Sequence, residues 1–363
     1  MARRDRNVPQ RDLRANNLVI VCEGTTTEYN YFQELADYVL VNGLSSFSSI
    51  KVLPTPDEVI QSKNPNKRSK RNFVGGNAKE FRYYTKKESS QQLYDKYKGQ
   101  PTRYLREAQL YLLENGYNEG WAVYDKDHHS DHEGAMKLLE STPNLHVAFS
   151  AYSFEEWLLV HFERNEFAYN HSDCCDPQDK KPNPSCSGEN CIGGRLRTKN
   201  YIPDFSKTGT GYFQKYTLRG DGTLHSLPLI NAAWTRSIHA GQNRFACNPY
   251  TDVDVLVKKL LNGVESYLWG HWGDQMQVAG TTLVLNREGN VVNVKNQGDV
   301  SYIMSIDNWK FCDGNGVEIC NALKSSCILR KEDEMLNCIE ISSEFSLLLV
   351  KDSGRLIYFS LEY

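Results

Sequence analysis

Residues 18–24 read Leu18-Val19-Ile20-Val21-Cys22-Glu23-Gly24, and residues 121–127 read Trp121-Ala122-Val123-Tyr124-Asp125-Lys126-Asp127. Each stretch is a short, unbroken apolar run that ends in acidic residues. Runs of this length and composition predict buried parallel strands, which are covered on both faces. Ligands of open α/β sheets bind outside the carboxyl ends of the strands. We therefore expect a site at the point where these two strands end.

If the two strands are neighbours, the carboxylates of Glu23, Asp125 and Asp127 converge on one small volume. The two aspartates are two residues apart, so in an extended backbone both point to the same side. Uncompensated carboxylates repel one another, and a hard divalent cation such as Mg²⁺ or Mn²⁺ relieves that repulsion. Such a cation polarises a phosphate and lowers the pKa of a bound water. The pattern outlines a metal-dependent phosphoryl-transfer site, with Glu23 as a further ligand or as general acid/base. Read singly, an acid at the end of a strand is often a cap or turn residue.

The order of elements predicts an α/β fold with a parallel sheet flanked by helices. After the first strand, Gly24 makes a turn, and Thr25 to Thr27 offer capping hydroxyls for a helix. A strand, a glycine turn and a helix N-terminus receive anions well, so Gly24 and Thr27 are candidate substrate contacts. Further helices are expected over 102–115 and 133–140, and a third strand over 145–150. Alternation of strands and helices with short links indicates a parallel sheet.

Length and composition bound the answer further. A chain of 363 residues with 40% hydrophobic and 24% charged residues is typical of a soluble protein of two domains. We expect a basic N-terminal arm over 1–16, an α/β domain over 17–263 and a separate domain over 264–363. The arm carries five arginines and is suited either to phosphate contacts or to a solvated tail. No apolar stretch is long enough to span a membrane and no signal peptide follows Met1, so a cytoplasmic protein is expected.

Residues 264–363 have a different sequence pattern from the rest of the chain. Short β-prone runs alternate with turns, among them Arg287-Glu288-Gly289-Asn290 and Asp352-Ser353-Gly354. This predicts an antiparallel all-β domain, a small barrel or sandwich, without a catalytic constellation. The segment holds 8 Lys and Arg against 14 Asp and Glu, so the preceding residues carry the basic excess. A mildly basic α/β domain suits a partner with a phosphate backbone.

Basic and aromatic residues are interleaved between residues 63 and 87. Arg68 and Arg71 lie in this stretch, with Phe73, Phe81 and Tyr83 nearby. Such a mixture tracks a nucleic-acid backbone and stacks on bases, so Arg68 and Arg71 are candidate substrate contacts. A solvated excursion beside the sheet explains the composition equally well.

A polar insert at about 165–200 concentrates four cysteines: Cys174, Cys175, Cys186 and Cys191. Together they could hold a structural Zn²⁺. Their spacing lacks the tight Cys-x2-Cys knuckles of strong zinc sites, and reduced thiols in an irregular insert are the alternative.

Four stretches resemble one bacterial family. They are Val21-Cys22-Glu23-Gly24 with Thr27 to Phe32, Val123 to His129, Ser150 with Phe154 to Phe162, and Asn248-Pro249-x-Thr251. In order and spacing the chain resembles RloB-like proteins over about residues 15–262. This family is similar to the Toprim nucleases and is often found in restriction and phage-defence loci.

The resemblance implies a Mg²⁺-dependent, Toprim-type nuclease that acts as an antiphage effector. Glu155 matches the family's Phe-Glu-x-Trp and would be a fourth acid, unless it is an ordinary surface glutamate. His129 matches a polar position after the acidic pair and would orient a water or a phosphate. Lys207 is the expected cation that stabilises charge on the transferred phosphate. His161, on an apolar helix stripe, is interpreted as a core histidine.

Several alternatives stay open at the level of sequence. The substrate could be DNA or RNA, for example a tRNA, because a basic-aromatic segment suits either. The chain could instead be a non-catalytic Toprim-like scaffold that binds a nucleotide or a protein. No Walker-A motif is present in the sequence, so any ATPase would be a separate partner. A phage-derived trigger and a homo-oligomeric state are further expectations.

Overall fold

The computed structural model describes residues 16–54, 101–126, 132–170, 187–219, 224–261, 266–331 and 334–362. The chain divides into two compact units. The α/β unit comprises Met1–Glu156, Tyr169–Lys215 and Val255–Asn262, and the β-rich unit comprises Trp157–Ala168, Tyr216–Asp254 and Gly263–Tyr363. The domain boundary expected near residue 263 stays a prediction.

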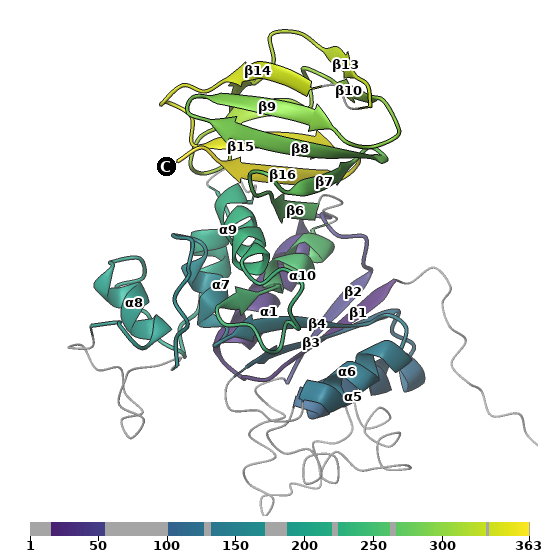
Figure 1. The fold of residues 1–363 in the computed structure, drawn as a ribbon. Helices are drawn as coiled ribbons and strands as arrows, with labels where there is room; N and C mark the ends of the chain where they lie inside the picture. The colour runs from purple at the N-terminus through teal and green to yellow at the C-terminus, as the bar shows by residue number, and fades with distance from the viewer. Residues whose placement is uncertain are drawn as a thin grey trace, which may run out of the picture. The chain divides into compact units, whose positions relative to one another are not determined.

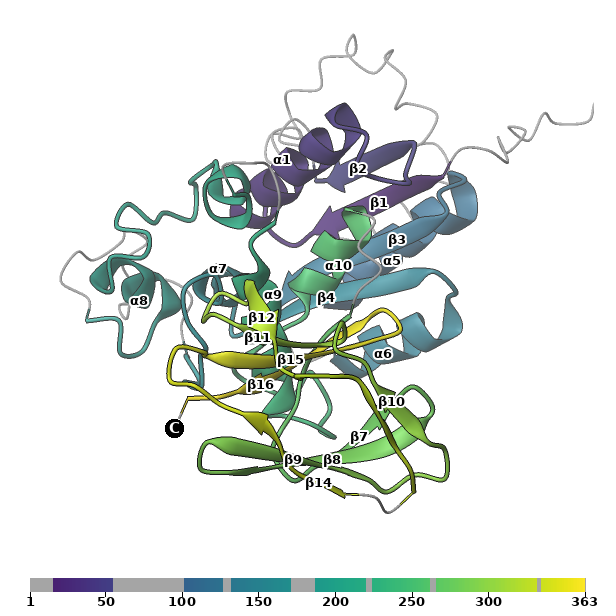
Figure 2. The same cartoon turned by 90° about the horizontal axis from the view of Figure 1, so that it is seen from above.

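The α/β unit is built on parallel strands that follow one another in the order β2-β1-β3-β4 (Figure 2). Helix α1 lies on one face of this sheet, and α5 and α6 lie on the other (Figure 1). The elements are β1 (Asn17–Cys22), α1 (Thr27–Val41), β2 (Ser49–Leu53), α5 (Pro101–Glu114), β3 (Glu119–Asp125), α6 (His132–Ser141), β4 (Leu145–Ala151) and α8 (Ile192–Thr198). The predicted parallel α/β sheet is confirmed.

Strand β1 is apolar without alternation because both of its faces are covered. Residues 18–22 are all buried, and Leu18, Val19 and Ile20 are fully so. Helices on both faces leave no solvent-facing side that would select polar residues. Cys22 pairs in register with Val123 of β3, so the two acid-tipped strands are neighbours as expected.

Helix α1 begins at Thr27 and packs through an apolar stripe. Its buried residues recur at the helical period, as in Tyr31, Phe32, Leu35 and Val39. The rings of Tyr31 and Phe32 contact Phe154 edge to face, at centroid distances of 5.5 and 6.1 Å. No threonine side chain caps the helix in the way the sequence predicted. The hydroxyl of Thr27 instead donates to the backbone carbonyl of Lys207 at 2.7 Å.

Three short elements contain residues of both units: α7 (Glu155–Leu159), the π-helical turn η1 (Phe213–Thr217) and α10 (Val253–Leu260). The β-rich unit adds the following elements: α9 (Ser226–Ser237), β5 (Tyr250–Thr251), β6 (Ser266–Trp269), β7 (Gln275–Val278), β8 (Thr281–Glu288), β9 (Val291–Asn296), β10 (Tyr302–Met304), β11 (Trp309–Cys312), β12 (Glu318–Asn321), β13 (Cys327–Leu329), β14 (Glu334–Glu340), β15 (Leu347–Asp352) and β16 (Arg355–Ser360).

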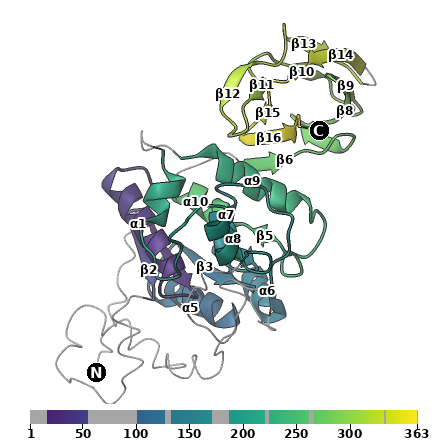
Figure 3. The same ribbon diagram turned by 90° about the vertical axis from the view of Figure 1, so that its left-hand side faces the viewer.

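The β-rich unit encloses its core between two sheets. One sheet has the order β12-β11-β15-β16-β6 and the other has the order β14-β9-β8-β7, and a small third sheet pairs β10 with β13. Figure 3 shows β11, β15 and β16 on one side of the unit and β8, β9 and β14 on the other. The pairs are antiparallel except for β16 with β6, which is parallel. The predicted antiparallel all-β region is confirmed.

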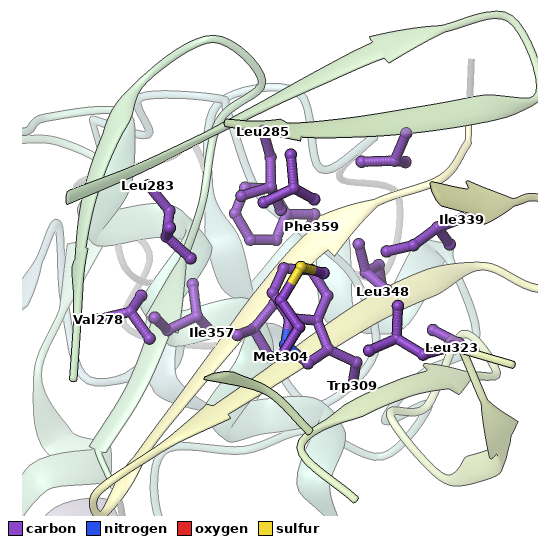
Figure 4. Packing of buried hydrophobic residues seen from close by; sticks show 14 of the residues in the cluster. Val278, Leu283, Leu285, Met304, Trp309, Leu323, Ile339, Leu348, Ile357 and Phe359 are labelled. Carbon is purple, nitrogen blue, oxygen red and sulfur yellow. The ribbon is translucent and has the colours of Figure 1, made fainter. Parts of the chain in front are cut away.

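The core between the two sheets is apolar and contiguous. Figure 4 shows Leu283 and Leu285 of β8 facing Leu348, Ile357 and Phe359 of the opposite sheet. Trp309 of β11 lies in the same cluster, and its indole N–H donates to the Tyr302 hydroxyl at 3.2 Å. Burial of such side chains stabilises a domain by about 1.5 to 3 kcal/mol each.

The run Leu347-Leu348-Leu349-Val350 is apolar on both faces of β15 for a structural reason. Leu348 and Val350 point into the core between the sheets. Leu347 and Leu349 point to the other face, where they pack with Ile230 of α9. A strand covered on both faces reads as a continuous apolar run rather than as an alternation.

Strands β15 and β16 form a hairpin at the predicted turn. Asp352 faces Arg355 in register, which leaves Ser353 and Gly354 as the two loop residues. Their φ angles are +30° and +80°, the signs that a type I′ turn requires. The side chains of Asp352 and Arg355 form an ion pair across the turn.

Sequence patterns missed some of the shorter elements. Strands β6, β7, β11 and β12 have four residues each, too few to show a period of two. The region 203–263 contains α9 and α10, whereas residues 201–210 contain turns and no helix or strand. In the described part of the chain, no helix has both the length and the apolar character needed to cross a membrane.

Two isoleucines of the β-rich unit allow a matched test of its core. Ile357 is 3% exposed in the core cluster, whereas Ile328 of β13 is 65% exposed. We expect Ile357→Ala to lower the free energy of unfolding by about 2 to 5 kcal/mol because it leaves a cavity. Ile328→Ala should change it by no more than about 0.5 kcal/mol. Urea denaturation followed by tryptophan fluorescence measures both, and equal effects would contradict this core.

Candidate functional site

Glu23 joins the carboxyl ends of the two central strands. It follows β1 directly, and its backbone N–H donates to the carbonyl of Val123 at 2.8 Å. Its Oε2 accepts a hydrogen bond from the backbone N–H of Asp125 at 3.0 Å. Its Oε1 accepts a longer one, 3.4 Å, from the hydroxyl of Tyr104 on α5. The carboxylate is therefore oriented by two donors and lies at the end of β3.

Asp125 is the last residue of β3 and is buried. It pairs in register with Ser150 of β4, and the next residue, Lys126, donates from its backbone N–H to the Ser150 carbonyl at 2.8 Å. The ends of β1, β3 and β4 therefore meet at one edge of the sheet. Asp127 and His129, together with Arg68 and Arg71, lie outside the described residues.

Glu155 begins helix α7 shortly after β4 ends. Its side chain is only 2% exposed, so it is not the ordinary surface glutamate that the sequence left as an alternative. Its Oε2 is buried and has no hydrogen-bond partner among the described residues. A buried carboxylate oxygen without a donor is costly, which points to a cation or a proton at this place.

Glu28 is the acidic residue that sequence reasoning missed. It lies in the first turn of α1, and its side chain is buried. Burial, followed by the negative charge of Glu155 and, more weakly, that of Glu23, raises the pKa of Glu28 to about 7. The signal was present in the sequence, since Glu28 falls on the same helical face as Phe32 and Leu35.

Gly24 makes room for the Glu28 carboxylate. A Cβ atom at Gly24 would collide with Oε2 of Glu28. The glycine expected as a substrate contact therefore has a direct structural role: any larger residue would push Glu28 out of its place.

Lys207 comes to this group of acids from a distant part of the sequence. Its backbone carbonyl is held by the hydroxyl of Thr27, 180 residues away. Its positive charge lowers the pKa of Glu28, which opposes the effect of burial and of the neighbouring acids. Thr27 is buried, so its hydroxyl positions Lys207 through the backbone. The charges of Glu23, Glu155 and Lys207 thus all act on Glu28 at the carboxyl edge of the sheet.

Comparison with known proteins assigns the family. The model of the family described as RloB-like protein matches residues 18–260, more than half of the chain. This chain belongs to the RloB-like protein family. Neither the curated proteins nor the solved structures gave a match. The matched residues of the RloB-like chain include Glu23, Asp125, Glu155 and Lys207, and they end before β6.

The acidic residues of the RloB-like chain offer the type of ligand that a hard cation prefers, but the described residues do not form a complete ligand set. Carboxylate oxygens are the ligands that Mg²⁺ and Mn²⁺ prefer. Within the described ranges, no three His, Cys, Asp or Glu side chains are grouped closely enough to hold a metal ion. Asp127, the expected partner of Asp125, lies outside those ranges. The metal centre therefore stays a prediction.

The thiol and the phenol beside these acids are held neutral. Burial, and then the charge of Glu28, raises the pKa of Cys22 well above its usual value. Burial and the charge of Glu23 raise the pKa of Tyr104 in the same way. Since a thiolate is the reactive form of cysteine, this shift disfavours Cys22 as a nucleophile. Tyr104 keeps its proton and donates a hydrogen bond to Glu23.

Two further residues that the sequence singled out, His161 and Cys191, are buried. His161 is buried, with Nδ1 2.7 Å from the Trp157 carbonyl and Nε2 2.9 Å from the Thr217 hydroxyl. Burial lowers the pKa of His161 to about 4, so it is neutral, and its interpretation as a core histidine is confirmed. Cys191 is buried next to α8, whereas Cys174, Cys175 and Cys186 lie outside the described residues.

The raised pKa of Glu28 has a consequence for stability. Between about pH 4.5 and 7 the folded chain holds a proton on Glu28 that the unfolded chain has released, so stability falls as the pH rises through this window. In the metal-free protein at about pH 8, we expect Glu28→Gln to raise the melting temperature, on the order of 5 °C. The gain should disappear below about pH 4.5.

Thermal unfolding in EDTA, followed by circular dichroism, measures this difference. Asp37→Asn is the matched control, because Asp37 is an exposed residue on the same helix. Equal melting temperatures of Glu28→Gln and wild type at about pH 8 would show that burial and the neighbouring acids do not raise the pKa of Glu28.

Proposed function

We propose that this RloB-like chain is a Mg²⁺- or Mn²⁺-dependent nuclease of Toprim type that acts in defence against phage. One observation carries the proposal: Glu28 is buried at the carboxyl edge of a parallel sheet, where the charges of Glu155, Glu23 and Lys207 act on it. Ligands of such sheets bind at this edge. Membership of the RloB-like family supports the defence context.

The acids present suit a divalent cation, and Asp125 and Asp127 would complete the set. Glu155 offers a buried carboxylate oxygen that no described residue hydrogen-bonds. The pKa of Glu28 is raised by burial and then by the charges of Glu155 and Glu23. When bound, Mg²⁺ or Mn²⁺ would polarise a phosphate and lower the pKa of an attacking water. Glu28 would then release its proton, since metal ligands of this kind bind in the ionised form.

The chain's own side chains have distinct tasks in this proposal. The N–H of Asp125 and the hydroxyl of Tyr104 hold the Glu23 carboxylate in one orientation, which fixes a ligand or proton acceptor before substrate binds. The ammonium group of Lys207 stabilises negative charge that develops on the phosphate. Lys207 is itself placed by the Thr27 hydroxyl.

The substrate is a nucleic acid, either DNA or RNA such as a tRNA. The basic-aromatic stretch with Arg68 and Arg71 is the proposed strand contact, and His129 is the proposed group that orients a water or a phosphate. The β-rich unit would recognise a phage-derived trigger or hold a partner such as a separate ATPase. A cytoplasmic homo-oligomer is part of the same proposal.

A second candidate function rests on one observation. The described acids are not grouped closely enough to hold a metal by themselves. A Toprim-like scaffold that binds a nucleotide or a protein without catalysis would need no such group. Cleavage of nucleic acid separates the two functions.

The decisive test is metal-dependent cleavage. With Mg²⁺ or Mn²⁺ we expect wild type to cut plasmid DNA or tRNA, with or without a phage lysate as trigger. Asp125→Ala and Glu155→Gln should each lower the rate by at least about 100-fold, because each removes a ligand. Gel electrophoresis of the products measures the rate.

Glu140→Gln serves as the control, since Glu140 is exposed on α6. It should leave the rate unchanged. Cleavage that persists in Asp125→Ala would contradict the assignment of the site. If neither substrate is cut under any of these conditions, the non-catalytic binding scaffold is favoured.

A further inference from the structure

The segment Ser206-Lys207-Thr208-Gly209-Thr210-Gly211, here called the 206–211 loop, has a composition suited to anions. It contains three hydroxyls, one ammonium group and two glycines, and no carboxylate. Thr208 and Thr210 are exposed, and Ser206 and Lys207 are partly exposed. Hydroxyl and ammonium donors are the groups that position phosphates in nucleic-acid complexes.

Hydrogen bonds from α1 hold the loop in place. The Lys207 carbonyl accepts from the Thr27 hydroxyl at 2.7 Å, and the Gly209 carbonyl accepts from the Asn30 side-chain amide at 3.4 Å. The N–H of Gly211 donates to Glu34 Oε1 at 2.6 Å. Two of the loop's backbone acceptors are therefore occupied by α1, while the Ser206 and Thr208 hydroxyls hydrogen-bond each other at 3.0 Å and Thr208 and Thr210 are exposed.

Tyr212 closes the loop. Its hydroxyl donates to the Ser206 carbonyl at 2.8 Å and accepts from the Ser206 N–H at 3.0 Å. The N–H of Gly209 also donates to the Ser206 carbonyl, at 2.9 Å. A Cβ atom at Gly209 would collide with the Tyr212 hydroxyl, so a glycine is needed there. The loop is thus fixed before any ligand binds, which lowers the entropy cost of binding.

The 206–211 loop lies next to the acidic residues. Lys207 lies near Glu28, at the border of the acidic group. A nucleic-acid phosphate that approaches several carboxylates is repelled by them. A set of donors beside the acids compensates this repulsion and fixes where the phosphate sits.

We propose that the 206–211 loop is a preformed binding site for a phosphate group of a nucleic-acid strand, next to the acidic residues. Lys207 and the Thr208 hydroxyl donate to the non-bridging oxygens, and Tyr212 is a positioning residue that holds the loop closed. This inference rests on the proposed nuclease function and adds to it the residues that hold the substrate backbone.

Binding tests the loop separately from catalysis. The probes are a fluorescent single-stranded DNA and an RNA of the same sequence, measured by anisotropy in EDTA so that no cleavage interferes. We expect Lys207→Met to weaken binding of at least one of them about tenfold. It should also lower the slope of log K against log salt by about 0.7, the value for one lost phosphate contact on a single strand.

The matched control is Lys199→Met, which removes an exposed lysine directly after α8 in the same segment. It should weaken binding less than twofold. Thr208→Val, which keeps the loop's charge, should weaken binding threefold or more without changing the salt slope. Inorganic phosphate should compete with the oligonucleotide for wild type and compete less well for Lys207→Met.

Equal effects of Lys207→Met and Lys199→Met, with Thr208→Val like wild type, would overturn the loop assignment. If metal-dependent cleavage persists in that case, the nuclease proposal stands while the loop falls. If wild type cuts no substrate but the variants still differ in binding, the loop stands as a phosphate site and the nuclease proposal falls. Circular dichroism confirms that Lys207→Met and Thr208→Val are folded.

Discussion

Confinement of several carboxylates at one edge of a parallel sheet is the constraint on which the proposed site depends. Glu23 is tied to the end of β3 by the Asp125 N–H, Glu155 is buried after β4, and Glu28 is buried on α1. Burial, and then the charges of Glu155 and Glu23, keeps the pKa of Glu28 near neutrality. Folded chains keep such an arrangement where a cation or a substrate uses it, because the repulsion lowers stability in the absence of a ligand.

Neighbouring residues hold these carboxylates in their positions. Gly24 leaves the volume that the Glu28 carboxylate fills, and the Tyr104 hydroxyl orients Glu23 from α5. Thr27, the first residue of α1, holds the Lys207 carbonyl through its hydroxyl. This hydrogen bond fixes the backbone that carries the Lys207 side chain.

The β-rich unit is organised around an apolar core rather than around charged groups. Its stability comes from an apolar core between two sheets, and α9 covers the outer face of one of them through Ile230. Because both faces of β15 are buried, the strand is apolar along its length, as in a parallel sheet, although it pairs in an antiparallel way. The acidic balance of residues 264–363 separates this part of the chain chemically from the basic 206–211 loop.

The sequence by itself determined the parallel α/β sheet, the β-rich segment and the neighbouring acids Glu23 and Asp125, because apolar runs and turn residues act over a few positions. The burial of Glu28 and Glu155 and the approach of Lys207 were decided only by the tertiary structure. A helix periodicity shows which face is covered, but it does not show which distant segment covers it. Contacts over 180 residues, such as that of Thr27 with Lys207, depend on the packing of the whole unit.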